Sequence, residues 1–352
     1  MHYVATLLRA WWCGATLLIA SCSTSEDLQI RQRLTIERAT GATFCSRSNT
    51  AILKSLDHSE LALSVDPRKC AVWKDPANDA TMYAVHFSVS GHTIPAVISI
   101  GPGGLGIGSN LPIMIRVVGG PGGIIAPQPR DLATNRLLKR GGLLVTVGYT
   151  GTSYRSTYPN PDFDIAASEI SYISRQIRRR CPTEAVILIG ESLGGMIAAA
   201  AVSGDFRGHA DLLILLSPLM YSPRMAAENF TRLHHFYESD RRMTIRLVRD
   251  GTHDKWSRIY SIDLFDRFFP VNRADEGLIA YLRGANGVPT TIMFGDLDEV
   301  IGVDVASQLT ASRSIRLLSI RGMNHEITSL QYENLINEID DEIRHVHRYS
   351  GT

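Results

Sequence analysis

The segment Ala185–Val202 constrains the fold of this chain more than any other part of the sequence. It reads AVILIGESLGGMIAAAAV, so that an apolar run breaks at Gly190, presents Ser192, and resumes as an alanine-rich stretch. An apolar run with β-branched residues, then a glycine turn, then a run of helix formers predicts a strand, a sharp turn and a helix. Such a unit is typical of a sheet covered by helices.

The turn has the pattern Gly-x-Ser-x-Gly, formed by Gly190, Ser192 and Gly194. A serine on so tight a turn has a strained backbone, and small residues on either side avoid clashes. The strain holds the hydroxyl clear of the sheet, at the amino end of the following helix, where negative charge is stabilised. The pattern therefore predicts that Ser192 is a nucleophile. A glycine-bounded loop with an exposed serine is the alternative.

A second glycine-rich segment, Gly119-Gly120-Pro121-Gly122-Gly123, follows the apolar run 112–118. Glycines directly after a strand let backbone amides approach a ligand closely. In an oxyanion hole of this kind, one amide comes from such a loop and the other from the residue after the nucleophile. We therefore expect the oxyanion donors to be the amides of Gly120 and Leu193.

The acid and the base that a serine nucleophile needs lie near the carboxyl terminus, each just past a predicted strand. The base must be within reach of the serine, and a carboxylate must fix its tautomer. Ser192, Asp298 and His325 occur in the chain order of an α/β-hydrolase. Asp298 is preferred because it lies past the tight turn, but Asp296 and Glu299 are close enough to compete for the role of the acid.

Short apolar runs alternate with helical patterns through most of the chain. Strands are predicted at 83–88, 94–100, 112–118, 142–147, 185–189, 212–216, 290–294 and 315–320, and helices after the turn, at 165–179 and at 326–346. The first two strands read as an antiparallel hairpin. The alternation predicts a mainly parallel sheet with right-handed crossovers.

The pattern changes between residues 221 and 286, where aromatic and basic residues recur in amphipathic, helix-like pieces. We expect a helical cap here, inserted into a core formed by residues 81–220 and 287–352. The adjacent pair His234-His235 is not expected to bind a metal, because neighbouring side chains on a helix point apart and no carboxylate or cysteine has suitable spacing. We expect neither a metal nor a cofactor.

Residues 1–21 have the features of a signal peptide, with one arginine and an apolar stretch too short to span a bilayer comfortably. The stretch ends in Ile19-Ala20-Ser21-Cys22, which resembles the bacterial lipobox. The resemblance implies cleavage before Cys22 and a lipid on that cysteine. Because Ser23 is not Asp, it also implies an outer-membrane lipoprotein of the cell envelope, facing the periplasm or the exterior. The alternatives are a secreted or periplasmic protein and an uncleaved anchor.

Residues 22–80 read as a tether and a lead-in segment with one or two short helices. In an oxidising compartment Cys45 and Cys70 are the natural pair for a disulfide, and Cys181 is left over as a buried thiol. The net charge of +1 gives no indication of nucleic-acid binding.

From about residue 82 onwards the chain looks like an α/β-hydrolase, and its glycine loop and serine turn are similar to those of the prolyl iminopeptidase family of serine aminopeptidases. That family carries His-Gly-Gly-Pro-Gly after its third strand and a helical cap. The resemblance implies hydrolysis of a small peptide through an acyl-enzyme, with Ser192, Asp298 and His325 as nucleophile, acid and base.

The chain departs from the family pattern at several positions. Val118 stands in place of the family's histidine, and Glu191 and Leu193 replace its usual glycine and tryptophan. The loop 148–153 lacks the Asp and Arg of an Asp-x-Arg-Gly stretch. These departures favour a carboxylesterase or lipase-like activity, whereas the proline-containing loop favours a peptidase, which we prefer slightly. A non-catalytic envelope lipoprotein that keeps the fold as a binding module is the competing class.

Overall fold

The computed structural model describes most of the chain from residue 71 onwards. The described residues are 43–44, 71–89, 92–102, 111–119, 129–149, 162–180, 182, 184–226, 228, 234–237, 242–245, 247–249, 252–254, 259–261, 268–269, 271–285, 287–298, 306–309, 314–323, 325 and 329–349. The predicted signal peptide, the lipidation site Cys22, all five cysteines and the oxyanion donor Gly120 lie outside them. Those predictions stay predictions.

The described residues form one large sheet and two small ones. The large sheet contains β1 (Thr43–Phe44), β2 (Ala71–Asp75), β3 (Ala80–Val89), β4 (His92–Ile100), β5 (Ile113–Val117), β6 (Leu143–Val147), β7 (Val186–Glu191), β8 (Leu212–Leu216), β14 (Thr290–Gly295) and β15 (Ile315–Ile320). Its order is β1-β2-β3-β4-β6-β5-β7-β8-β14-β15. Neighbours from β6 to β15 in this order run parallel, and those from β1 to β6 run antiparallel.

The central strands are buried on both faces. Every residue of β5, β6, β7 and β8 is buried, as expected of parallel strands that read as continuous apolar runs. The predicted hairpin is confirmed, since β3 and β4 pair antiparallel with Tyr83 opposite Ile98. β2 lies within residues 22–80 and pairs with β3, so the sheet extends ahead of the predicted core boundary at residue 81.

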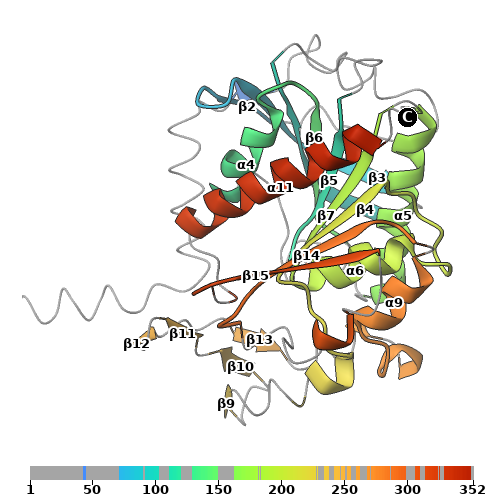
Figure 1. Ribbon diagram of the computed structural model, residues 1–352, viewed down its shortest axis with the longest axis vertical. Helices are drawn as coiled ribbons and strands as arrows, with labels where there is room; N and C mark the ends of the chain where they lie inside the picture. Colours follow the sequence, from blue (N-terminus) through green and yellow to red (C-terminus); the bar gives the residue numbers. More distant parts are fainter. Residues whose placement is uncertain are drawn as a thin grey trace, which may run out of the picture.

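Helices cover both faces of the sheet (Figure 1). The described helices are α4 (Pro129–Thr134), η1 (Asn135–Leu138), α5 (Phe163–Arg180), α6 (Leu193–Val202), η2 (Val271–Arg273), α9 (Leu278–Gly284), η3 (Ser307–Leu309) and α11 (Ser329–Tyr349). Side chains of α5, α6 and α9 share one apolar core, and side chains of η1 and α11 share the other. Side chains alternate along a strand, so Ile115 of β5 faces the first core and Met114 faces the second.

The prediction that residues 221–286 consist of helix-like pieces is wrong in part. This segment contains β9 (His234–Tyr237), β10 (Arg242–Ile245), β11 (Leu247–Arg249), β12 (Thr252–Asp254) and β13 (Ile259–Ser261). They form a three-stranded and a two-stranded antiparallel sheet. The aromatic and β-branched residues of this segment favour strands over helices. His234 and His235 therefore lie on β9 rather than on a helix.

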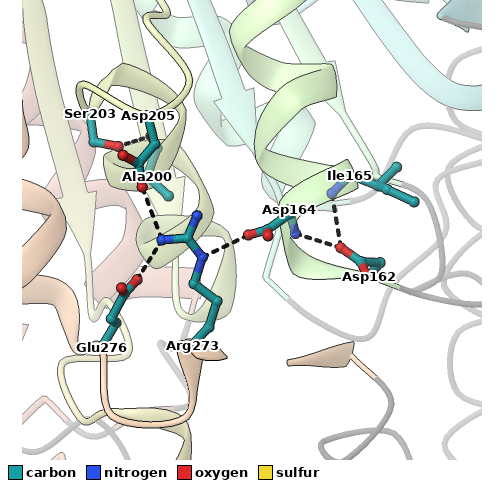
Figure 2. Close-up of polar contacts among 8 residues, drawn as sticks. All are labelled: Asp162, Asp164, Ile165, Ala200, Ser203, Asp205, Arg273 and Glu276. Atoms are coloured by element: carbon teal, nitrogen blue, oxygen red, sulfur yellow. Dashed lines mark hydrogen bonds and ion pairs between the residues drawn. The ribbon is translucent and has the colours of Figure 1, made fainter. Parts of the chain in front are cut away.

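The end of the inserted segment is attached to the core by Arg273 (Figure 2). Its guanidinium donates to Asp164 near the start of α5 (3.0 Å), to Asp205 after α6 (2.9 Å) and to Glu276 ahead of α9 (2.7 Å). It also lies 5.7 Å from the centre of the Phe206 ring.

Among the described residues, no helix combines the length and apolar character needed to cross a membrane.

Candidate active site

Ser192 lies between β7 and α6, at the carboxyl end of the central strands. The predicted strand, turn and helix are all present, and the backbone of Ser192 has φ 51° and ψ −123°. This positive φ is a strained conformation for a residue with a side chain. Hydrogen bonds hold the turn, since the amide of Ser192 donates to the carbonyl of Leu216 (3.0 Å) and the amide of Gly195 donates to the carbonyl of Ser192 (2.9 Å).

The glycines on either side of Ser192 allow backbone segments to approach closely. A Cβ atom on Gly190 would lie 2.6 Å from the Cα of Gly195, and one on Gly194 would lie 2.2 Å from the carbonyl oxygen of Val118. Both distances are far shorter than a van der Waals contact. The packing of β7 against α6 and of α6 against the end of β5 therefore requires glycine at both positions.

The structure brings together the three side chains that the sequence predicts. The Oγ of Ser192 lies 3.0 Å from Nε2 of His325, and Nδ1 of His325 lies 3.1 Å from Oδ2 of Asp298. The Asp298 side chain is fully buried and that of His325 is 14% exposed. A neutral imidazole can therefore accept the Ser192 proton at Nε2 while its Nδ1–H donates to Asp298, the arrangement that fixes the tautomer of the base.

The competing acid Asp296 has a different role. It is exposed, and its Oδ1 accepts a hydrogen bond from the amide of Gly322 (2.7 Å), which lies in the turn ahead of His325. The geometry therefore places Asp298 rather than Asp296 on the imidazole. Glu299, the other competitor, lies outside the described residues.

One of the two expected oxyanion donors can be located. Leu193 is the first residue of α6, so its amide lies at the positive end of the helix dipole. Gly120 lies outside the described residues, but Gly119 directly before it lies against the turn. A Cβ on Gly119 would be 3.3 Å from the Cβ of Ser192. The glycine-rich loop therefore begins beside the nucleophile.

A buried ionic cluster lies next to the turn, and the sequence analysis did not predict it. Arg116 on β5 donates from Nε to Oε1 of Glu191 (2.8 Å) and from Nη2 to Oε2 (3.2 Å), and its Nη1 pairs with Asp131 on α4. All three side chains are at most 6% exposed. The signal that could have found two of them is the presence of a charged residue in an otherwise apolar strand.

Tyr332 of α11 completes this cluster. Its hydroxyl donates to Oε1 of Glu191 (2.8 Å) and lies 3.0 Å from Oγ1 of Thr134, and its ring lies 5.9 Å from the guanidinium carbon of Arg116. Burial lowers the pKa of Arg116, but its carboxylate partners Glu191 and Asp131 raise it, and the pKa stands well above its usual value. The guanidinium is therefore always charged.

The described residues contain no group of three or more His, Cys, Asp and Glu side chains that could hold a metal ion. A hydroxyl, an imidazole and a carboxylate in sequence can activate the hydroxyl for attack on a carbonyl carbon.

The chain is similar in fold to several solved structures. Est1E from Butyrivibrio proteoclasticus aligns with a TM-score of 0.52 and 15% identity, over 76% of this chain and 98% of that one. The alpha/beta hydrolase GrgF from Penicillium sp. sh18 aligns with a TM-score of 0.53 and 13% identity, over 77% of this chain and 99% of that one. No protein-family model matches the sequence, and no curated protein matches it significantly. The sheet order, the turn at Ser192 and these similarities together establish that the chain has the α/β-hydrolase fold.

Proposed function

We propose that this chain is a serine hydrolase that forms an acyl-enzyme on Ser192. The observation that carries the proposal is the pair of hydrogen bonds from Ser192 Oγ to His325 (3.0 Å) and from His325 to Asp298 (3.1 Å). These bonds join a nucleophile on a strained turn to a base, and the base to a buried carboxylate. Among the described residues, none of these three side chains belongs to either apolar core.

The reaction follows from these contacts. Ser192 Oγ attacks the substrate carbonyl carbon while His325 Nε2 takes the hydroxyl proton. The amides of Leu193 and Gly120 stabilise the resulting oxyanion. When the tetrahedral intermediate collapses, His325 gives the proton to the leaving amine or alcohol, and the acyl group remains on Ser192. Water then attacks the acyl-enzyme by the same steps, which releases the acid and restores the serine.

The substrate class that we prefer is a small peptide cleaved in the manner of an aminopeptidase. The support for this preference is the resemblance of the loop 119–123 to the loop of the prolyl iminopeptidase family. An ester is the second candidate, and Val118 and Glu191, which depart from that family's pattern, support it. Est1E, a protein of the same fold, has been solved with ferulic acid bound, and a carboxylic acid is the product that either kind of substrate releases.

We also propose that the protein works at the cell envelope, held there by a lipid on Cys22. The support is the apolar stretch and the lipobox-like residues that end at Cys22. The Cys22→Ala variant should move from the membrane fraction to the soluble envelope fraction of cells that express it. A variant that stays with the membrane would contradict the lipid anchor and leave the hydrolase proposal intact.

The first test of the hydrolase proposal is covalent labelling by a fluorophosphonate probe. The wild-type protein should be labelled, and Ser192→Ala should not be. Unlabelled wild-type protein and Ser192→Ala are then assayed on aminoacyl-naphthylamides, proline included, and on short-chain nitrophenyl esters. Cleavage of the amides supports the peptidase, and cleavage of the esters alone supports the esterase. A folded wild-type protein that takes no label would overturn the hydrolase proposal in favour of a binding module.

The acid is tested by a matched pair of variants. Asp298→Asn should lower kcat by roughly 10³- to 10⁴-fold, because an amide at this position stabilises the wrong imidazole tautomer. Asp296→Asn keeps the oxygen that accepts from Gly322 and should change kcat by no more than a few-fold. Equal losses in the two variants would contradict the assignment of Asp298.

A further inference from the structure

We propose that Glu191, held by Arg116 and Tyr332, is a positioning residue that sets the nucleophile Ser192 and the base His325 at the correct separation. This inference rests on the proposed function and names further residues that act in it. Glu191 is a buried carboxylate directly before the nucleophile, and it accepts hydrogen bonds from Arg116 of β5 and from Tyr332 of α11.

On the side of the nucleophile, Glu191 is held by Arg116 of β5. Glu191 is the last residue of β7, its backbone pairs with Leu216 of β8, and its two carboxylate oxygens both accept from Arg116. The peptide that leads into Ser192 is therefore fixed by the backbone on one side and by the side chain on the other. A positive φ such as that of Ser192 persists only where the surroundings leave the residue no alternative.

The base side of the contact is formed by α11, which begins at Ser329, shortly after His325 in the chain. Tyr332 in its first turn donates to Oε1 of Glu191. A carboxylate can only accept hydrogen bonds, and a tyrosine has one hydroxyl proton to donate. Tyr332 therefore donates its one hydrogen bond to Glu191 and accepts one from Thr134. The helix that follows the base is therefore attached to the residue that precedes the nucleophile.

The cost of burying these charges indicates that the cluster positions groups rather than stabilises the fold. Arg116, Glu191 and Asp131 are taken out of water together, and apolar residues of similar volume often give equal or greater stability at such positions. What apolar residues cannot supply is direction, since a bidentate pair and a hydroxyl hydrogen bond each define a distance and an angle. A misplacement of about 1 Å between reacting groups can cost on the order of a hundredfold in rate.

The test compares three variants that each remove one buried hydroxyl. Tyr332→Phe removes the bond to Glu191 and keeps the ring next to Arg116. Thr134→Val removes the other bond of Tyr332. Thr291→Val removes the hydrogen bond from Thr291 of the sheet to Glu342 of α11. At 2.8 Å this bond is as long as the one from Tyr332 to Glu191. Thr134→Val and Thr291→Val do not touch Glu191, so they control for the docking of α11 alone.

The readout is the saturable labelling rate with the fluorophosphonate probe, which separates the rate of the covalent step from the affinity for the probe. Tyr332→Phe should slow the covalent step about tenfold with unchanged affinity, because a hydrogen bond to a charged group is lost. The two threonine variants should stay within about twofold of wild type. Urea unfolding of each variant checks that the labelled proteins are folded.

Two results would overturn this inference alone. In one, the wild-type protein is labelled and Tyr332→Phe is labelled at the same rate. In the other, Thr291→Val loses as much as Tyr332→Phe, so that any loosening of α11 has the same effect. A wild-type protein that takes no label would overturn the proposed function, and this inference with it.

Discussion

Arg116 pairs with two carboxylates and Arg273 with three, and the two clusters lie in different surroundings. Arg116 lies beside the serine turn, and its partners Asp131 and Glu191 are 1% and 6% exposed. Arg273 lies where the inserted segment rejoins the core, and its partners Asp164, Asp205 and Glu276 are 36% to 60% exposed (Figure 2). The chemistry of the contacts is the same, but only the first cluster is removed from water.

This difference in exposure changes what each cluster contributes. A buried ion pair incurs a large desolvation cost, so it adds little net stability but is expensive to break, because the remaining charge stays buried. An ion pair with exposed carboxylates is screened by water and salt and is worth little either way. The contribution of an arginine to stability therefore depends more on the exposure of its partners than on the number of its ion pairs.

The largest effect is expected for Arg116→Met. The substitution leaves Glu191 and Asp131 buried without a counter-charge and should lower the free energy of unfolding by about 3–5 kcal/mol. Urea unfolding followed by circular dichroism measures the loss. A loss under about 1 kcal/mol, as expected of a surface pair, would remove the contrast between the two arginines.

The second prediction distinguishes the contribution of the buried cluster to stability from its contribution to the geometry of the site. Replacing Arg116, Asp131 and Glu191 together by Met, Leu and Met removes every charge of the cluster, so the free energy of unfolding should return to within about 1–2 kcal/mol of wild type. Fluorophosphonate labelling should nevertheless stay at least about tenfold slower than in wild type, because the carboxylate that accepts from Tyr332 is gone. Wild-type labelling by this triple variant would show that the cluster is dispensable for geometry.

A smaller effect is expected for Arg273→Met, the surface counterpart of Arg116→Met. Its partners can turn to water, so the free energy of unfolding should fall by no more than about 1 kcal/mol, and less at high salt. Labelling of Ser192 should proceed as in wild type. A loss as large as that of Arg116→Met would mean that the depth of the guanidinium matters more than the exposure of its partners.

The smallest effect concerns pH. Burial, together with the charges of Asp162 and Glu276, raises the pKa of Asp164, and the charge and hydrogen bond of Arg273 lower it by less, so the pKa in the folded protein lies above its ordinary value of 3.8. The folded state therefore holds this proton more tightly than the unfolded state, and stability falls as the pH rises from 3.8 through the folded pKa.

Asp164→Asn removes this dependence. The stability of the variant relative to wild type should therefore rise with pH across that window, by an amount that solvent screening keeps small. Asp205→Asn is the matched control, because Asp205 contacts the same guanidinium from a more exposed position. Urea unfolding at several pH values measures both variants. A relative stability that falls with rising pH would contradict the sign.

Local patterns carried most of the fold prediction. The predicted strands from residue 83 onwards and the two long helices are present because apolar runs and helical spacing are properties of neighbouring residues. β2 escaped prediction because it lies in a polar stretch, and its pairing with β3 holds it in the sheet. The short strands of residues 221–286 were taken for helices because aromatic residues suit either structure and the pairing decides between them.

What the sequence by itself determined is the turn at Ser192 and the order of Ser192, Asp298 and His325 along the chain. Both depend on residues close together, on glycines that admit a strained backbone and on polar residues that follow apolar runs. Only the tertiary structure decided that Asp298 rather than Asp296 reaches the imidazole, because the two aspartates share one turn and differ in which way the fold turns each carboxylate.

The same limit applies to the buried cluster. Arg116, Glu191 and Tyr332 are far apart in the sequence, and no local pattern joins them. Their hydrogen bonds exist because β5 pairs with β7 and Tyr332 of α11 reaches Glu191 at the end of β7. Directional contacts between distant segments are defined only once the whole chain has folded, because a carboxylate has no preferred partner until the sheet brings one within about 3 Å.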